Sequence, residues 1–216
     1  MVKPKFITFT GFDDRTCIDQ MVDISKAYPV EWGVLVSPHN RDARFPSNQA
    51  IKELVDRYWN LNLSMHCCGQ YSRNVQSLGE FPYQEFILAF KRFQLNGKII
   101  VSKSDIVSMY KKIGASFIFQ GSNFDRSLSN QNSDAISVLF DTSGGRGIVP
   151  DKFPMHPGFF CGYAGGISPE NVIEVIEKIN APEGAEYWID METGVRTNGW
   201  FDMQKVMLVC DRVFRF

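Results

Sequence analysis

The sequence predicts an α/β protein whose fold is a (βα)8 TIM barrel, formed by a single domain over residues 1–216. Short runs of apolar, β-branched or aromatic residues recur eight times, and helix-like segments follow most of them. Strands that alternate with helices form parallel sheets, and eight such units in a chain of this length suit a closed barrel. An open doubly wound sheet is the alternative, which the lack of Gly-x-Gly-x-x-Gly after the first strand disfavours.

The first half of the chain contains four strand–helix units. Ser47 and Ser104 are expected to cap the second and fourth helices, and Gly114 to end the fourth. The expected strands are residues 5–11, 31–38, 62–69 and 91–97, and the expected helices are residues 13–28, 48–60, 82–90 and 104–114.

The second half contains the other four strands but fewer clear helices. Residues 125–134 are too polar to predict a helix between the fifth and sixth strands. The expected strands are residues 115–123, 135–145, 158–166 and 185–194, and the expected helices are residues 168–179 and 200–213.

Composition and charge exclude several classes of partner. The formal net charge is −1, and no basic run exceeds two residues, so no nucleic-acid partner is expected. No apolar run is long enough to span a membrane, and the first residues do not resemble a secretory signal. The five cysteines lack zinc spacing, and no other cluster suggests a metal site. We therefore expect a cytoplasmic protein with no membrane partner.

Glycines follow the seventh and eighth predicted strands, at Gly165, Gly166 and Gly194. In (βα)8 barrels, phosphate groups often bind at the loops after these two strands. Glycine lets backbone N–H groups approach an anion, and a helix begins shortly after the first pair. We expect these glycines, with Thr193, to cradle one phosphate, the alternative being that they are ordinary turn residues.

Three further side chains are candidates for acid–base chemistry. Asp141 ends the sixth predicted strand before a glycine-rich loop, which suits proton transfer under a lid. Strand alternation places His66 and Cys68 on the face opposite to Cys67, so both can face the barrel centre. The alternatives are a solvated aspartate, a hydrogen-bonded core histidine and a packing cysteine.

Segments of the last third resemble phosphoribosylanthranilate isomerase of tryptophan biosynthesis. AGGISPENV (164–172) closely matches the family's seventh-strand motif, Ala/Ser-Gly-Gly-Leu-x-Pro-Glu-Asn-Val. FDTSGGRGIVPDKF (140–153) matches its sixth-strand motif and loop, and IDMETGVRT (189–197) its eighth-strand motif. Weaker similarity covers residues 33–38, 44–47 and 94–97.

This resemblance implies a cofactor-free Amadori rearrangement, in which a phosphorylated ribosylamine becomes a 1-deoxy-ketose. It implies that Asp141 is the general acid that opens the ribose ring. It also implies that Arg44 lies near the anthranilate carboxylate and that Asp190 lies at the rim of the active site. The implied phosphate ligands are Gly165, Gly166, Thr193 and Gly194.

The sequence departs from the family at positions where the family has catalytic or substrate-binding residues. The family's general base is the cysteine of Lys-Ile-Cys-Gly-Ile-Thr-Asn, and ungapped alignment with KFITFTGFDD puts Ile7 there, or Thr8 after a one-residue slip. A family histidine is replaced by Asn96, and an eighth-strand serine by Glu192, which would repel a phosphate unless it points away. The sequence therefore leaves open a related isomerisation, a catalytically silent binder of a phosphorylated small molecule, and the oligomeric state.

Overall fold

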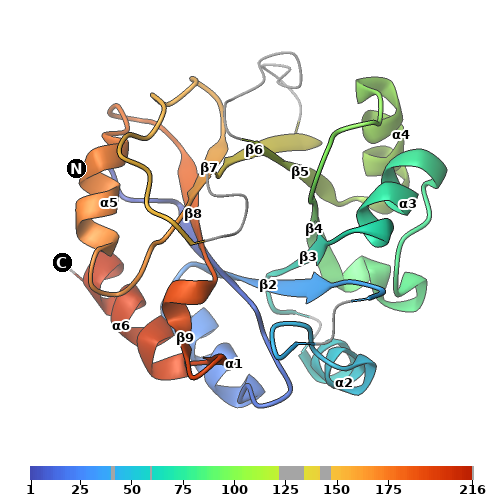
Figure 1. Ribbon diagram of the computed structural model, residues 1–216, viewed down its shortest axis with the longest axis horizontal. Coiled ribbons are helices and arrows are strands. Elements are labelled where there is room, and N and C mark those ends of the chain that lie inside the picture. The colour runs from blue at the N-terminus through green and yellow to red at the C-terminus, as the bar shows by residue number, and fades with distance from the viewer. Residues whose placement is uncertain (40–41, 59, 122–133, 142–146, 216) are drawn as a thin grey trace.

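The computed structural model describes residues 1–39, 42–58, 60–121, 134–141 and 147–215. Eight parallel strands follow one another around a closed barrel, and β1 pairs with β8 to close it. Figure 1 shows the strands as an inner ring with the helices outside. The predicted (βα)8 barrel is therefore confirmed. The strands are β1 (Phe6–Thr10), β2 (Val30–Val36), β3 (Leu63–Cys67), β4 (Phe90–Leu95), β5 (Ser116–Gly121), β6 (Ile136–Phe140), β7 (Cys161–Ala164) and β8 (Tyr187–Met191).

The helices pack their apolar faces on the outside of this ring. A short hairpin of β9 (Arg196–Thr197) and β10 (Trp200–Phe201) precedes the last helix. The predicted segment 125–134 falls almost entirely outside the described residues. The helices are α1 (Ile18–Ala27), α2 (Asn48–Tyr58), α3 (Gln70–Leu78), α4 (Lys103–Ile113), α5 (Val172–Ile179) and α6 (Met203–Phe214).

The connection between β3 and β4 differs from the prediction. The predicted helix at residues 82–90 is a short 3-10 helix, η1 (Gln84–Ala89), and the crossover helix is α3. Sequence periodicity missed α3 because two of its three buried residues are polar, namely Ser72 and Gln76. The Gln76 amide donates to the Ser72 hydroxyl and to a backbone carbonyl, and it accepts from the N–H of Ile100. Hydrogen bonds thus replace apolar packing on this helix.

The predicted helix ends are largely correct. Ser47 accepts a hydrogen bond from the N–H of Ala50, as an N-cap should, and Gly114 ends α4 with a φ of 72°. The cap of α4 is Ser102, not Ser104, because the Ser102 hydroxyl accepts from the N–H of Asp105. Ser102 and Ser104 are both suitable N-cap residues and lie two positions apart, so the sequence alone does not show which of them caps the helix.

The interior of the barrel is divided into a polar side and an apolar side. On the apolar side Ile118, Leu139, Ala164 and Trp188 form a small cluster between β5 and β8. On the polar side the Arg92 guanidinium donates twice to the Glu31 carboxylate, at 2.7 Å each, and lies 4.2 Å from the centre of the Trp188 ring. This buried ion pair lies in the interior of the barrel, below the carboxyl ends of the strands.

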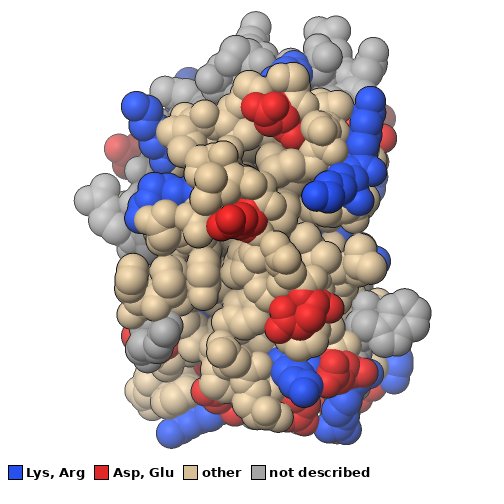
Figure 2. Space-filling model, turned by 90° about the vertical axis from the view of Figure 1, so that its right-hand side faces the viewer, with Lys and Arg blue, Asp and Glu red and all other residues tan. Residues whose placement is uncertain are grey.

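The outer surface shows no segregation of charge on the face around α3 and α4. Basic and acidic side chains are interspersed there among uncharged residues (Figure 2). Within the described part of the chain, none of the helices has the length and apolar character needed to cross a membrane.

Candidate active site

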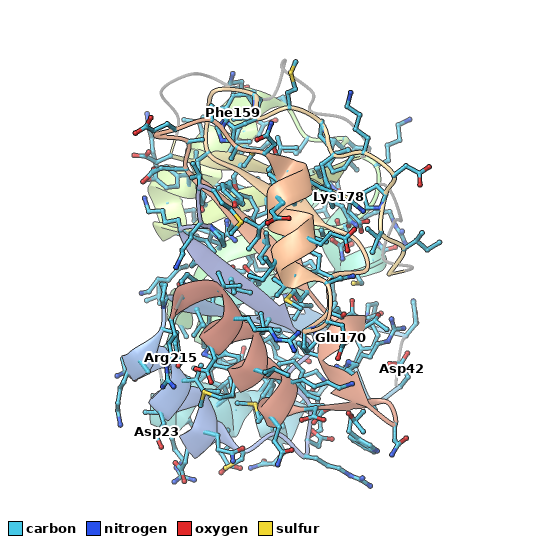
Figure 3. The ribbon with its side chains drawn as sticks, turned by 90° about the vertical axis from the view of Figure 1, so that its left-hand side faces the viewer. Asp23, Asp42, Phe159, Glu170, Lys178 and Arg215 are labelled. Carbon is cyan, nitrogen blue, oxygen red and sulfur yellow. The ribbon has the colours of Figure 1, made fainter. Side chains whose placement is uncertain are left out.

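An open pocket of about 710 Å³ lies at the carboxyl ends of the barrel strands. Figure 3 shows Asp42 and Glu170, which follow β2 and β7, on the same side of the molecule. All nine candidate residues predicted from the sequence line this pocket, although they come from five different strands or the loops after them. They are Arg44, His66, Cys68, Asp141, Gly165, Gly166, Asp190, Thr193 and Gly194.

The loops after β7 and β8 pack directly against each other. A methyl group on Gly194 would lie 2.0 Å from the carbonyl oxygen of Ile167, so no larger residue fits there without moving backbone. The Asn171 side chain fixes the first loop, because it accepts from the N–H of Ser168 and donates to the carbonyl of Gly166. Among the described residues, the N–H groups of Gly165 and Gly166 donate no hydrogen bond. They therefore remain available to an anion.

Asp141 lies on the pocket wall just beyond β6. Its carboxylate accepts a 2.5 Å hydrogen bond from the Gln120 amide, and its side chain lies beside Gly165. Residues 142–146 of the predicted glycine-rich loop are outside the described residues, whereas Gly147 follows at the pocket wall. Asp141 thus has the position that a proton donor to a bound sugar requires.

Asp190 lies at the same level of the barrel as Asp141. Ala164 of β7 pairs with Asp190, and the β6–β7 register places Ala164 level with Asp141. Two strand spacings of about 4.8 Å separate their backbones by roughly 9–10 Å, and both carboxylates line the pocket. The small Ala164 side chain leaves the space between them free for a ligand.

The Asp190 carboxylate is buried and titrates at an unusual pH. The Thr10 hydroxyl donates to it at 2.8 Å and lies 3.5 Å from Nδ1 of His66. Burial raises the pKa of Asp190 to about 8; the Thr10 hydrogen bond opposes this rise, and the negative charges of Glu31 and Glu192 add to it. A carboxyl group that titrates near neutral pH suits proton transfer.

His66 and Cys68 face the pocket, as strand alternation predicts, while Cys67 lies in the outer core. Burial lowers the pKa of His66 to about 4, and its Nε2 lies 3.0 Å from the Ser64 hydroxyl. Burial also raises the pKa of the Cys68 thiol, whose sulfur accepts from the Asn96 amide. His66 is therefore a weak base near neutral pH, and Cys68 a poor source of thiolate.

Arg44 is already paired with two carboxylates. It donates to both oxygens of Asp42 at 3.0 Å and to Glu192 at 3.3 Å. Burial raises the pKa of Glu192, and the Arg44 guanidinium opposes that shift. Glu192 therefore lines the pocket and is paired with the positive charge of Arg44. This pairing offsets the repulsion that the sequence predicts between Glu192 and a phosphate.

Sequence comparison placed the first-strand residue incorrectly. Ile7 is fully buried in the core outside the barrel ring, so no side chain at that position reaches the pocket. Thr8 is buried against Glu31, whereas Thr10 lines the pocket. Thr10 precedes Gly11, as the family's cysteine precedes a glycine, so Thr10 is the pocket-lining candidate for that position. That glycine was the signal that an ungapped alignment missed.

Two other pocket residues escaped the sequence analysis. Gln120 contacts Asp141, and the buried Gln94 has a side-chain oxygen with no hydrogen-bond partner within the described residues. Alternating polar residues on β4 and β5 would have indicated both. In the loop after β2, His39 is exposed, and Arg41 lies outside the described residues. No cluster of potential metal ligands occurs among the described residues.

Comparison with known proteins identifies the family. The family model for N-(5′-phosphoribosyl)anthranilate isomerase matches residues 87–212, more than half of the chain. Comparison with curated protein sequences gives no match.

The fold agrees with solved structures at low sequence identity. The phosphoribosylanthranilate isomerase of Pyrococcus furiosus aligns at 15% identity with a TM-score of 0.62, covering 98% of this chain and 99% of that one. That of Thermococcus kodakaraensis aligns at 18% identity with a TM-score of 0.59, covering all of both chains. A mutant tryptophan synthase α-subunit from Pyrococcus furiosus aligns at 10% identity with a TM-score of 0.54, over 90% of both chains. These structures share the barrel fold, and the family match over more than half of the chain shows that the chain belongs to the N-(5′-phosphoribosyl)anthranilate isomerase family.

Proposed function

We propose that this protein isomerises a phosphorylated ribosylamine to a 1-deoxy-ketose. The observation that carries the proposal is that one pocket is lined by Gly165 and Gly166, whose N–H groups donate no hydrogen bond within the described residues, by Gly194 and by the carboxylate of Asp141. The amides suit a phosphate dianion, as backbone donors at the start of a helix generally do. Family membership supports the same substrate class.

In this proposal Asp141 is the general acid. It protonates the ribose ring oxygen, so that the bond between C1 and that oxygen breaks and the nitrogen lone pair forms the C1=N bond. Loss of the C2 proton then gives an enolamine, which tautomerises to the ketone at C2 with protonation of C1. No atoms are gained or lost overall, so the reaction requires no co-reactant. Asp190 is the titratable group at the same level that can contact C2.

Steady-state turnover of N-(5′-phosphoribosyl)anthranilate tests the proposal. We expect the protein to form the 1-deoxy-ketose, detected by NMR, and to restore growth of a tryptophan auxotroph that lacks the isomerase. Asp141→Asn is expected to lower kcat by about 10²- to 10⁴-fold, as loss of a general acid does. Asp151→Asn is the matched control, because Asp151 is an exposed aspartate of the same loop outside the pocket.

A catalytically silent binder of a phosphorylated small molecule is the second candidate. It is favoured by Thr10, which stands where the family has its base and has no acid–base function near neutral pH. Calorimetry with a reduced analogue of the ketose product distinguishes the two. Binding that depends on Gly166 and is unchanged by Asp141→Asn, without turnover of the ribosylamine, would support the binder and contradict the isomerase.

A further inference from the structure

The pocket has a second region beyond the phosphate loops and Asp141. Leu35 and Phe45, from the end of β2 and the loop after it, line the pocket next to Arg44. The Arg44 guanidinium carbon lies 5.7 Å from the centre of the Phe45 ring. An apolar wall of this kind suits a flat, aromatic substituent on the ribosylamine nitrogen.

The charge beside this wall does not suit an anionic substituent. Arg44 supplies one positive charge, and Asp42 and Glu192 supply two negative charges at 3.0 and 3.3 Å from it. The hydrogen bonds from Arg44 hold the pKa of Asp42 below its usual value, so Asp42 stays ionised. Each of the three guanidinium nitrogens already donates to one of these carboxylates. Two of the five guanidinium N–H groups are left over, and a ligand carboxylate that used them would lie close to both negative charges.

Glu192 is the residue that changes this balance. It is largely buried, with 22% of its side chain exposed, and it lies on the strand end between Asp190 and the phosphate loop. Asp42 is half exposed, so water screens its charge more than that of Glu192. The family's sequence pattern has serine where this chain has Glu192, which gives a natural substitution for a test.

We propose that Glu192 is a specificity-determining residue that neutralises Arg44 and makes the pocket select ribosylamine phosphates whose aromatic amine carries no carboxylate. The inference rests on the proposed function for the identity of the reaction. It assigns a substrate class that differs from N-(5′-phosphoribosyl)anthranilate by loss of a negative charge.

Two substrates that differ only in that carboxylate test the proposal. N-(5′-phosphoribosyl)anthranilate and N-(5′-phosphoribosyl)aniline form when ribose 5-phosphate condenses with anthranilate or aniline. We measure kcat/KM for both by NMR, and the Kd of both reduced product analogues by calorimetry. The wild-type protein is expected to favour the uncharged member of each pair by roughly tenfold or more, because a like charge is placed close to Glu192.

Three variants isolate the cause. Glu192→Ser is expected to remove or reverse the preference, because it removes the negative charge 3.3 Å from the Arg44 guanidinium. Arg44→Gln is expected to increase it, since Asp42 and Glu192 then lack a counter-charge. Glu186→Ser is the matched control, because Glu186 precedes the same strand, is also ion-paired, to Lys5 at 2.7 Å, and lies outside the pocket.

The binding arm separates this inference from the proposed function. If neither ribosylamine is turned over but the analogues show the preference and Glu192→Ser removes it, the isomerase proposal fails and the assignment of Glu192 stands. If the wild-type protein binds the anthranilate analogue as tightly as the aniline analogue, or Glu192→Ser leaves the ratio unchanged, the inference is wrong whatever the turnover.

Discussion

Gly194→Ala places one methyl group between the two proposed phosphate loops. The new carbon would lie 2.0 Å from the Ile167 carbonyl oxygen and 2.9 Å from the Ser168 Cα, and both are backbone atoms that cannot rotate away. To restore an ordinary contact of about 3.4 Å, the loops must separate by about 1.4 Å. A phosphate held by one loop would then lie about 1.4 Å farther from the N–H groups of the other loop. A hydrogen bond of about 2.9 Å from those N–H groups to the phosphate would exceed 4 Å and be lost.

The magnitude follows from the anion. A hydrogen bond to a charged group contributes about 1.5–3 kcal/mol, so losing one weakens binding by roughly 10- to 100-fold. Calorimetry with ribose 5-phosphate measures this change, and thermal unfolding shows whether the variant remains folded. Gly184→Ala is the control: its φ of 79° strains an alanine, but it lies before β8 at the other end of the barrel with no atom near the added methyl group, so stability and not the Kd is expected to change. A folded Gly194→Ala protein with the wild-type Kd would refute the two-loop phosphate site.

Three further experiments test the interior of the barrel. Asp190 has a native pKa of about 8 against an unfolded value near 4, so the native state holds a proton that the unfolded state loses between these values. Wild-type stability should therefore fall more steeply than that of Asp190→Asn as pH rises from 4 to 8, measured by urea unfolding; equal slopes would contradict the burial argument. Arg92→Met should lower the free energy of unfolding by about 3–5 kcal/mol, because it leaves the buried Glu31 carboxylate without its ion-pair partner. Adding Glu31→Gln should recover part of that stability. No recovery in the double variant would mean that loss of the ion pair is not the cause. Thr10→Cys should raise kcat by up to about 10²-fold by restoring a base at the end of β1, and an unchanged rate would mean that Thr10 is not the family's cysteine position.

The architecture could be predicted because the barrel repeats one local pattern. Each strand is a short apolar run, and seven of the eight predicted strand positions needed no information beyond their own residues and neighbouring turns. The sixth predicted strand, residues 135–145, is too long, because β6 ends at Phe140 and Asp141 lies beyond it. The α3 helix could not be predicted, because its buried face contains the polar residues Ser72 and Gln76. Its stability depends on hydrogen bonds that only the folded chain forms.

The site could be predicted only where a motif marks it. The glycines after β7 and β8 and Asp141 were found because the ends of parallel strands must meet at one face. Thr10 was missed because an ungapped alignment puts the family's cysteine at Ile7, three residues earlier on the strand, and an odd shift places the side chain on the opposite face. The Arg44–Glu192 pair joins residues 148 positions apart, and no local pattern indicates that two such charges will meet.

A crystal structure of the protein with a reduced analogue of the ketose product tests the central claim most directly. We predict a phosphate within about 3 Å of the N–H groups of Gly165, Gly166 and Gly194, and the C2 atom of the sugar between Asp141 and Asp190. A phosphate bound elsewhere, for example at Arg44, with no contact to those three amides, would contradict the account.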